Sequence, residues 1–173
     1  MKTSVIVFPG SNCDRDAAVA LKQATGQDPH MIWHKETSLP SGLDLVLLPG
    51  GFAYGDYLRC GAIATFSPVM KAVKQHADEG RLLVGICNGF QMLTEMHLLP
   101  GAHMRNQGLT FIHRLVPLKV ENTATPFSKN YSSEKPVSFY LSNHDGNYTV
   151  DEDTLKSLED NNQIVYRYCD AAG

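Results

Sequence analysis

"VGICNGFQ", residues 84–91, places a cysteine between an apolar run and an Asn-Gly pair. The run RLLVGI predicts a short buried strand, and the residues after the cysteine, NGFQMLTEMHLL, carry apolar side chains at helical spacing. Cys87 therefore falls where a strand turns sharply into a helix, which is the geometry of a nucleophile elbow. Gly85 and Gly89 fit this turn because they carry no side chain that would obstruct it.

Predicted strands and helices alternate through the first hundred residues. Strands are expected at residues 3–8, 31–34, 43–51 and 82–86. Helices are expected at residues 13–26, at 67–80, and from Cys87 to a stop at Pro100-Gly101. The second helix would have Ser67 as its N-cap and Pro68 as its first residue. This alternation indicates βαβ units and a parallel sheet with helices on both faces.

The pattern changes in the last third of the chain. Residues 109–122 and 135–150 alternate apolar and polar side chains, which is typical of antiparallel strands with one solvated face. A short helix at 151–161 and a strand at 163–168 follow. The expected fold class is therefore α/β, a flavodoxin-like parallel sheet flanked by helices with an antiparallel excursion. We expect one domain over residues 1–173.

Composition excludes several classes of protein. The chain has 173 residues, 43% of them hydrophobic, and a net charge of −3, so we expect a globular protein with a substantial core. It has no basic cluster, which argues against a nucleic-acid partner. No apolar run is long enough to span a membrane or serve as a signal peptide, and we expect a cytoplasmic protein. Its cysteines lack metal-ligand spacing, so no metal site is expected.

The carboxyl ends of the strands carry the candidate chemistry, as is usual in open α/β sheets. The N-terminus of the helix after Cys87 would favour the thiolate and lower the pKa of the thiol. An attacked carbonyl becomes an oxyanion and needs donors, which the backbone N–H of Asn88 and the flexible pair Gly50-Gly51 could supply. The alternative is that Cys87 is a buried packing residue and Gly51 only part of a turn.

Three stretches together resemble one family. The chain opens with VIVFPGSNCDRD and continues with LPGGFAYGDYLRCGA and GICNGFQ. In this combination it resembles the glutaminase subunits of phosphoribosylformylglycinamidine synthase, which are class I glutamine amidotransferases of purine biosynthesis. The resemblance runs over essentially the whole chain, including LEDNNQIVYRYCD. It implies a class I glutamine amidotransferase-like fold.

The resemblance also implies a reaction and its residues. Cys87 would attack the side-chain amide of glutamine, form a glutamyl thioester and release ammonia and then glutamate. Gly51 and Asn88 would supply the oxyanion-hole N–H groups. Residues that would bind glutamine are Gln91, Gly50, Phe52 and His144. The subunit would need no cofactor of its own, because ATP and Mg would be used by a synthetase subunit that receives the ammonia. A small accessory subunit is a further expected partner.

One expected part is missing from the sequence. The family serves its thiol with a His and a Glu in a Pro-His-Pro-Glu motif near the C-terminus, and this motif is absent here. The chain is therefore interpreted as lacking its C-terminal segment, either as a fragment or as a shortened, inactive homologue, and its catalysis should be impaired. His34, with Glu36, is a disfavoured base because it reads as a surface residue. His144 is expected to shape the pocket rather than act as the base.

Two other functions remain open. The chain could be a non-enzymatic scaffold that keeps the fold and docks a synthetase. It could also be a glutaminase that serves another synthase, such as one that forms pyridoxal phosphate, although the loop GFAYGDYLRCGA argues against this. The remaining histidines are expected to be solvated or packing residues: His30, His76, His97, His103 and His113.

Overall fold

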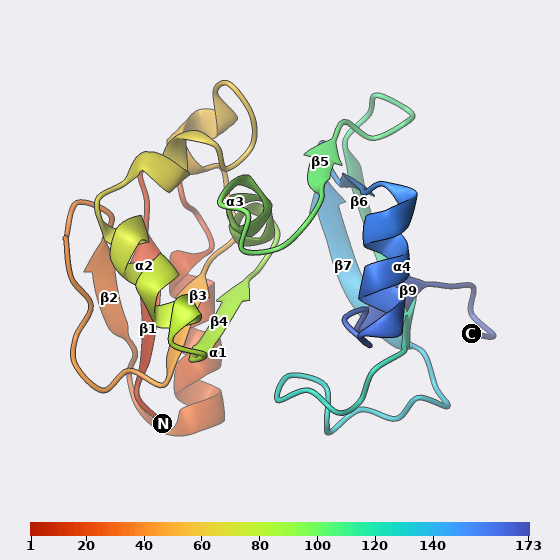
Figure 1. Cartoon of the computed structure of the whole chain (residues 1–173), viewed down its shortest axis with the longest axis horizontal. Helices are drawn as coiled ribbons and strands as arrows, with labels where there is room; N and C mark the ends of the chain where they lie inside the picture. Colours follow the sequence, from red (N-terminus) through yellow and green to blue (C-terminus); the bar gives the residue numbers. More distant parts are fainter. The chain divides into compact units, whose positions relative to one another are not determined.

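Four parallel strands form a sheet in the order β2-β1-β3-β4 (Figure 1). Their bounds are Thr3–Val7 for β1, His30–Trp33 for β2, Leu45–Leu48 for β3 and Leu82–Gly85 for β4. This is the strand order of flavodoxin-like sheets, so the predicted fold class is confirmed. The computed structural model describes all of residues 1–173, and their contacts group into two units, 1–103 and 104–173. Each unit is described by itself below.

Helices cover both faces of the sheet in the first unit. They are α1 (Asp14–Thr25), α2 (Val69–Asp78) and α3 (Asn88–Glu95). Successive residues of a strand point to opposite faces. Val5 accordingly packs in the cluster that contains residues of α1, whereas Ile6 packs in the cluster that contains residues of α2 and α3. The sheet is therefore the middle layer of three.

Two helix boundaries differ from the prediction. Helix α2 begins at Val69 with Pro68 as the flanking residue, and no side chain caps it, because the Ser67 hydroxyl is hydrogen-bonded elsewhere. Helix α3 ends at Glu95, before the predicted stop at Pro100-Gly101. It ends there because His97 adopts a left-handed conformation (φ 55°), and its N–H donates to the Thr94 carbonyl in a Schellman motif.

Two predicted strands are also shorter than expected. The predicted strand at 43–51 is reduced to β3, because the residues after Leu48 turn away into a loop that leads to α2. This loop contains two short 3-10 segments, η1 (Ala53–Asp56) and η2 (Ile63–Phe66). The predicted strand at 163–168 is reduced to β9 (Tyr166–Tyr168).

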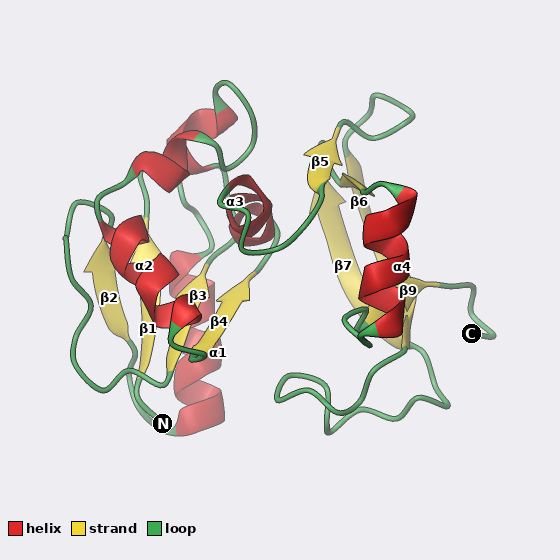
Figure 2. Cartoon of the chain, viewed as in Figure 1, coloured by secondary structure: helices red, strands yellow, loops and turns green.

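The second unit is built on an antiparallel sheet of three strands (Figure 2). Its strands, in the order β7-β6-β9, comprise Val137–Asn143, Ile112–Val120 and β9. The shorter elements are β5 (Ala102–Met104, at the junction of the units), β8 (Asn147–Thr149) and α4 (Glu152–Asp160). The expected antiparallel excursion is therefore present. None of the helices is both long and apolar enough to cross a membrane.

Candidate active site

Cys87 lies on a sharp turn between β4 and α3. Its backbone has φ 54° and ψ −107°, a combination that residues with side chains rarely adopt. The turn needs glycine at position 89, because a Cβ there would lie 2.1 Å from the Leu48 carbonyl oxygen. Helix α3 thus begins directly against the backbone of β3. The strand-turn-helix arrangement predicted around Cys87 is present.

The Gly50-Gly51 pair lies beside this turn. A Cβ on Gly50 would lie 3.4 Å from Cβ of Cys87 and 3.7 Å from Cβ of Cys13. Gly51 has φ 135°, and a Cβ there would lie 2.7 Å from the backbone nitrogen of Asn12. Both positions therefore bring main chain, without side chains, up to the cysteine.

Two backbone N–H groups converge on the Cys87 sulfur. They belong to Asn88 and Gly51, and both donate hydrogen bonds that act to lower the pKa of the thiol. They come from separate elements, one from the start of α3 and one from the loop after β3. These are the two groups that sequence reasoning assigned to the oxyanion hole. The structure brings them together, and the oxyanion role itself stays a prediction.

The protonation of Cys87 differs from the expectation. Burial of the sulfur raises the pKa of the Cys87 thiol, the N–H of Asn88 lowers it, and the nearby Cys13 and Asp56 raise it further. Although part of the residue is solvent-exposed, the net shift is upward, so the expected net lowering by the helix N-terminus is wrong. The hydrogen bond from the Asn88 N–H, at the start of α3, lowers the pKa by less than desolvation raises it. A base is therefore needed to form the thiolate near neutral pH.

The side chain of Asn88 connects the elements around the cysteine. Asn88 is buried, and its Oδ1 accepts a hydrogen bond from the N–H of Ala53 at 3.0 Å. Its Nδ2 donates to Asp56 Oδ1 and to Gln91 Oε1, both at 2.9 Å. The loop after β3 is thus fastened to the first turn of α3. Sequence reasoning used only the backbone of Asn88; the signal for this second role is a buried amide next to the elbow.

The other predicted glutamine-binding residues of the first unit lie in different environments. Gln91 is 7% exposed, and its Oε1 accepts a hydrogen bond from Asn88. Phe52 is 49% exposed, and its N–H donates to the Gly10 carbonyl. Gln91 and Gly50 lie on elements that flank Cys87, and Phe52 follows Gly51. Their contacts with glutamine stay predictions.

His34 is not the surface residue that the sequence suggested. It is 5% exposed, and its Nδ1 is hydrogen-bonded to the Tyr54 hydroxyl at 2.6 Å. Glu36 does not pair with it but accepts from the N–H of Trp33. The sequence interpretation failed because the loop after β3 folds back over the end of β2, a contact that no local pattern reveals. Burial lowers the pKa of His34 and favours the neutral imidazole.

His144 belongs to the second unit. Its imidazole lies 3.3 Å from a carboxylate oxygen of Asp145, and its Nδ1 lies 3.1 Å from the guanidinium of Arg105. Its predicted part in the glutamine pocket stays a prediction. Among the histidines expected to be solvated or to pack, His76 is buried, with Nε2 3.0 Å from the Leu82 carbonyl oxygen.

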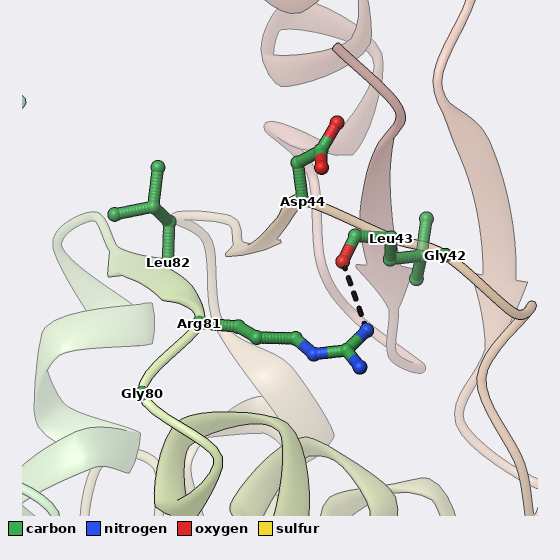
Figure 3. Close-up of a pocket in the computed structure, with 6 residues that line it drawn as sticks. All are labelled: Gly42, Leu43, Asp44, Gly80, Arg81 and Leu82. Atoms are coloured by element: carbon green, nitrogen blue, oxygen red, sulfur yellow. Dashed lines mark hydrogen bonds between the residues drawn. The ribbon is translucent and has the colours of Figure 1, made fainter.

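A hollow of about 350 Å³ lies at the opposite edge of the sheet (Figure 3). Its lining comes from the turns that lead into β3 and β4: Gly42, Leu43, Asp44, Gly80, Arg81 and Leu82. The guanidinium of Arg81 reaches across it and donates to the Leu43 carbonyl at 3.3 Å. Because the strands are parallel, this is the amino edge, whereas Cys87 follows the carboxyl end of β4. The hollow is therefore separate from the candidate site.

No group of three or more His, Cys, Asp or Glu side chains is arranged to hold a metal ion. Cys87 at the carboxyl edge lies beside two backbone N–H donors, with Cys13 and Asp56 nearby. This arrangement matches acyl transfer through a cysteine, in which charge develops on a carbonyl oxygen.

The fold and this site define a class of protein. Over residues 1–173 the chain matches the CobB/CobQ-like glutamine amidotransferase domain. The chain belongs to this family.

Curated relatives narrow the comparison. The chain is 54% identical over 171 residues to the phosphoribosylformylglycinamidine synthase subunit PurQ of Zymomonas mobilis, a match that covers 99% of this chain and 77% of the relative. It is 53% identical over 173 residues to the protein of the same name from Bradyrhizobium diazoefficiens, covering 100% of this chain and 74% of the relative. The chain therefore spans about three quarters of their length.

A solved structure gives the same picture. A chain in the structure of PurLQS from Thermotoga maritima superposes with a TM-score of 0.83 and is 37% identical in sequence. The match covers 96% of this chain and 74% of that chain. The resemblance drawn from the sequence motifs is therefore confirmed at the level of family and fold.

Proposed function

We propose that the protein is the glutaminase subunit of a phosphoribosylformylglycinamidine synthase, as its relatives are named. It would hydrolyse glutamine to glutamate and ammonia and supply the ammonia to purine biosynthesis. One observation carries the proposal: the N–H groups of Gly51 and Asn88 converge on the sulfur of a cysteine that a strained turn presents. A cysteine kept only for packing would need neither the strain nor the donors.

The reaction begins with attack of Cys87 Sγ on the side-chain carbonyl carbon of glutamine. The carbonyl oxygen becomes negatively charged as the S–C bond forms, and the N–H groups of Gly51 and Asn88 stabilise that charge. The C–N bond then breaks, the nitrogen takes up a proton, and ammonia leaves a glutamyl thioester. Water attacks the thioester through a second oxyanion, which releases glutamate and regenerates the thiol.

Glutamine binding would be shared among the residues around the elbow. Gln91 and Phe52 flank Cys87 in the first unit, and Gly50 leaves room for the substrate chain. The amide of Gln91 can both donate and accept hydrogen bonds, which suits the charged head group of an amino acid.

The partners follow from the proposed reaction. The relatives and the PurLQS structure support association with a synthetase subunit. A small accessory subunit would be a further partner. ATP and Mg would be used by the synthetase, and this subunit would hold no cofactor. The whole assembly would work in the cytoplasm.

We further propose that the 173-residue polypeptide turns glutamine over slowly when no other segment supplies a base. The pKa of Cys87 is raised, so the thiol is mostly protonated at neutral pH, and the Pro-His-Pro-Glu motif is absent from these residues. General acid–base help is worth about 10²–10⁴-fold. A polypeptide extended through Pro-His-Pro-Glu should be faster by at least the lower figure when glutamate release is assayed with the synthetase present.

Selective labelling tests the assignment of the nucleophile. A chloroketone analogue of glutamine should alkylate Cys87 in preference to the other cysteines, because only Cys87 lies beside both N–H donors. Peptide mapping after limited labelling measures the selectivity, and glutamine should protect Cys87. The internal controls are Cys13, Cys60 and Cys169; equal modification of any of them, or no protection by glutamine, would argue for a scaffold that only docks a synthetase.

A further inference from the structure

A buried polar cluster lies under the loop after β3. It consists of His34 at the end of β2, Tyr54 in η1 and Ser67 before α2, and it is called the His34 cluster below. The Tyr54 hydroxyl is hydrogen-bonded to His34 Nδ1 at 2.6 Å and to Ser67 Oγ at 2.9 Å. The rings of His34 and Tyr54 meet edge to face, with centroids 5.4 Å apart. The cluster thus joins three segments that are distant in sequence.

Packing alone does not explain the imidazole. The Nε2 atom of His34 is buried without a hydrogen-bond partner, which is unfavourable for a polar atom. An apolar side chain of similar size would avoid this cost. What the imidazole provides is the hydrogen bond of its other nitrogen, Nδ1, which holds the Tyr54 hydroxyl.

Tyr54 needs such an anchor because its backbone is strained. It has φ 55° and is followed by two more residues with positive φ, Gly55 and Asp56. The N–H of Tyr54 donates to the Pro9 carbonyl at 2.7 Å. A residue with a side chain keeps such a conformation only when its surroundings fix it. The loop is therefore held at Tyr54 by its main chain on one side and by the His34 cluster on the other.

The anchor lies close to the oxyanion donors along the chain. Gly51 is three residues before Tyr54, and between them Ala53 donates its N–H to the side chain of Asn88. A shift of Tyr54 would move this short segment as a whole and change the direction of the Gly51 N–H. Small displacements of this kind affect rate strongly, because the donors must meet the oxyanion of the transition state.

We infer that the His34 cluster is a positioning device that holds the Gly51 N–H in the orientation required to stabilise the oxyanion. This inference rests on the proposed glutaminase function and adds residues that touch neither the substrate nor the nucleophile. His34, Tyr54 and Ser67 are positioning residues. Their loss lowers kcat more than it raises KM, since oxyanion stabilisation is realised in the transition state.

The test uses the polypeptide extended through Pro-His-Pro-Glu, assembled with its synthetase. Tyr54→Phe keeps the ring and removes the hydroxyl, and His34→Leu removes the nitrogen that holds it. Each should lower kcat for glutamate release about tenfold with less than a twofold change in KM. His34→Asn restores a polar atom near the position of Nδ1 and should recover most of the rate. The double variant Tyr54→Phe/His34→Leu should be no slower than either single variant, because both break one bond.

Matched controls separate positioning from stability. Tyr57→Phe removes a hydroxyl from the same loop, where the residue is 75% exposed. His76→Leu removes a buried imidazole that contacts the Leu82 carbonyl, outside the site. The first should change nothing, and the second should lower the melting temperature while kcat stays unchanged.

A second measurement does not depend on turnover. The rate of Cys87 alkylation by the glutamine-like chloroketone is divided by its rate with iodoacetamide. In each reaction a thioether forms, the halide leaves and the thiol proton passes to solvent. Only the chloroketone places its carbonyl oxygen at the donors, so the ratio should fall in Tyr54→Phe and His34→Leu and stay constant in both controls.

The outcomes distinguish a failure of the positioning role from a failure of the proposed glutaminase function. Loss of kcat with a falling alkylation ratio and recovery in His34→Asn would support the inference. An active wild type with unchanged kcat in Tyr54→Phe, or an equal loss in His76→Leu, would overturn the inference alone. A wild-type polypeptide extended through Pro-His-Pro-Glu that releases no glutamate in the assembly would overturn the proposed function and the inference with it.

Discussion

Backbone with positive φ occurs at both edges of the four-stranded sheet, but the kinds of residue that adopt it differ between the edges. At the amino edge, the turns that lead into β3 and β4 have positive φ at Gly42 and Gly80, where a Cβ would meet nothing within 4 Å. At the carboxyl edge, positive φ occurs at glycines such as Gly51 and Gly55 but also at residues with side chains: Tyr54, Asp56, Leu58 and Cys87. Left-handed backbone costs glycine little and other residues about 1–2 kcal/mol each.

The difference indicates where the molecule stores strain and for what purpose. The carboxyl edge is held in its conformation by buried and partly buried hydrogen bonds from Asn88 and from the His34 cluster. At the amino edge the positive-φ glycines have open space around them, and the nearby bond of Arg81 with the Leu43 carbonyl is partly buried. Strain persists where surrounding structure enforces it, and such places are typically functional. Each prediction below compares the edges or tests the strain at one of them.

The largest effect is expected at Cys87. Replacing it with alanine or glycine should lower glutamate release by roughly 10⁴–10⁶-fold, as the loss of other nucleophiles does. Because φ is 54° and ψ −107°, Cys87→Gly should also be more stable than Cys87→Ala by about 1 kcal/mol, the reverse of the usual order. Urea unfolding of both variants measures this. An alanine variant that is the more stable of the two would show that the turn is not strained.

A pair of glycine substitutions contrasts the edges directly. Gly89→Ala places a methyl group 2.1 Å from the Leu48 carbonyl oxygen and should cost about 3 kcal/mol or more, because backbone must move. Gly80→Ala has open space around it and should cost about 1 kcal/mol, for its positive φ alone. Thermal and urea denaturation give both values. Equal losses would mean that the carboxyl edge is no more tightly built than the amino edge.

Gln91→Ala should weaken the use of glutamine. Loss of a hydrogen bond to the charged head group costs about 1.5–3 kcal/mol, which would raise KM by roughly ten- to a hundredfold. The assay is glutamate release by the active assembly. Gln75→Ala, on α2, removes an exposed amide that pairs with Glu79 and serves as the control. An unchanged KM in Gln91→Ala would assign the binding to another residue.

The smallest effect is expected at the amino edge. Arg81→Ala removes the contact with the Leu43 carbonyl and a 3.1 Å ion pair with Glu79. Both side chains of the ion pair are substantially exposed, so stability should fall by no more than about 1 kcal/mol. Glutaminase activity should not change. A clear fall in activity would show that the hollow at this edge communicates with the site.

The local parts of this arrangement could be predicted from sequence. An apolar run, a cysteine and closely spaced glycines predicted the elbow, and the Pro-Gly-Gly segment predicted close approach of backbone. Strand and helix order followed from periodicity, since each element carries its own pattern. Gly26, predicted to stop the first helix, does so in a left-handed conformation, with its N–H donating to the Lys22 carbonyl.

The parts that failed depend on distant contacts. His34 looked like a surface residue because charged residues follow it in the sequence, and the folded loop from Tyr54 buries it. The pKa of Cys87 was expected to fall because the helix N-terminus can be read from sequence, whereas desolvation by neighbouring elements cannot. The end of α3 was misplaced because His97 adopts a conformation usually associated with glycine.

The close approach of Gly89 to Leu48 has a consequence for motion. The Leu48 carbonyl also accepts the N–H of Ile86 at 3.0 Å, so the turn that presents the thiol is joined to the central strand on both sides of Cys87. Amides held this way exchange with solvent only when the sheet itself opens, whereas loops held by side chains open locally and more often. We therefore expect the Ile86 amide, next to the thiol, to exchange more slowly than the amides of the loop that follows β3.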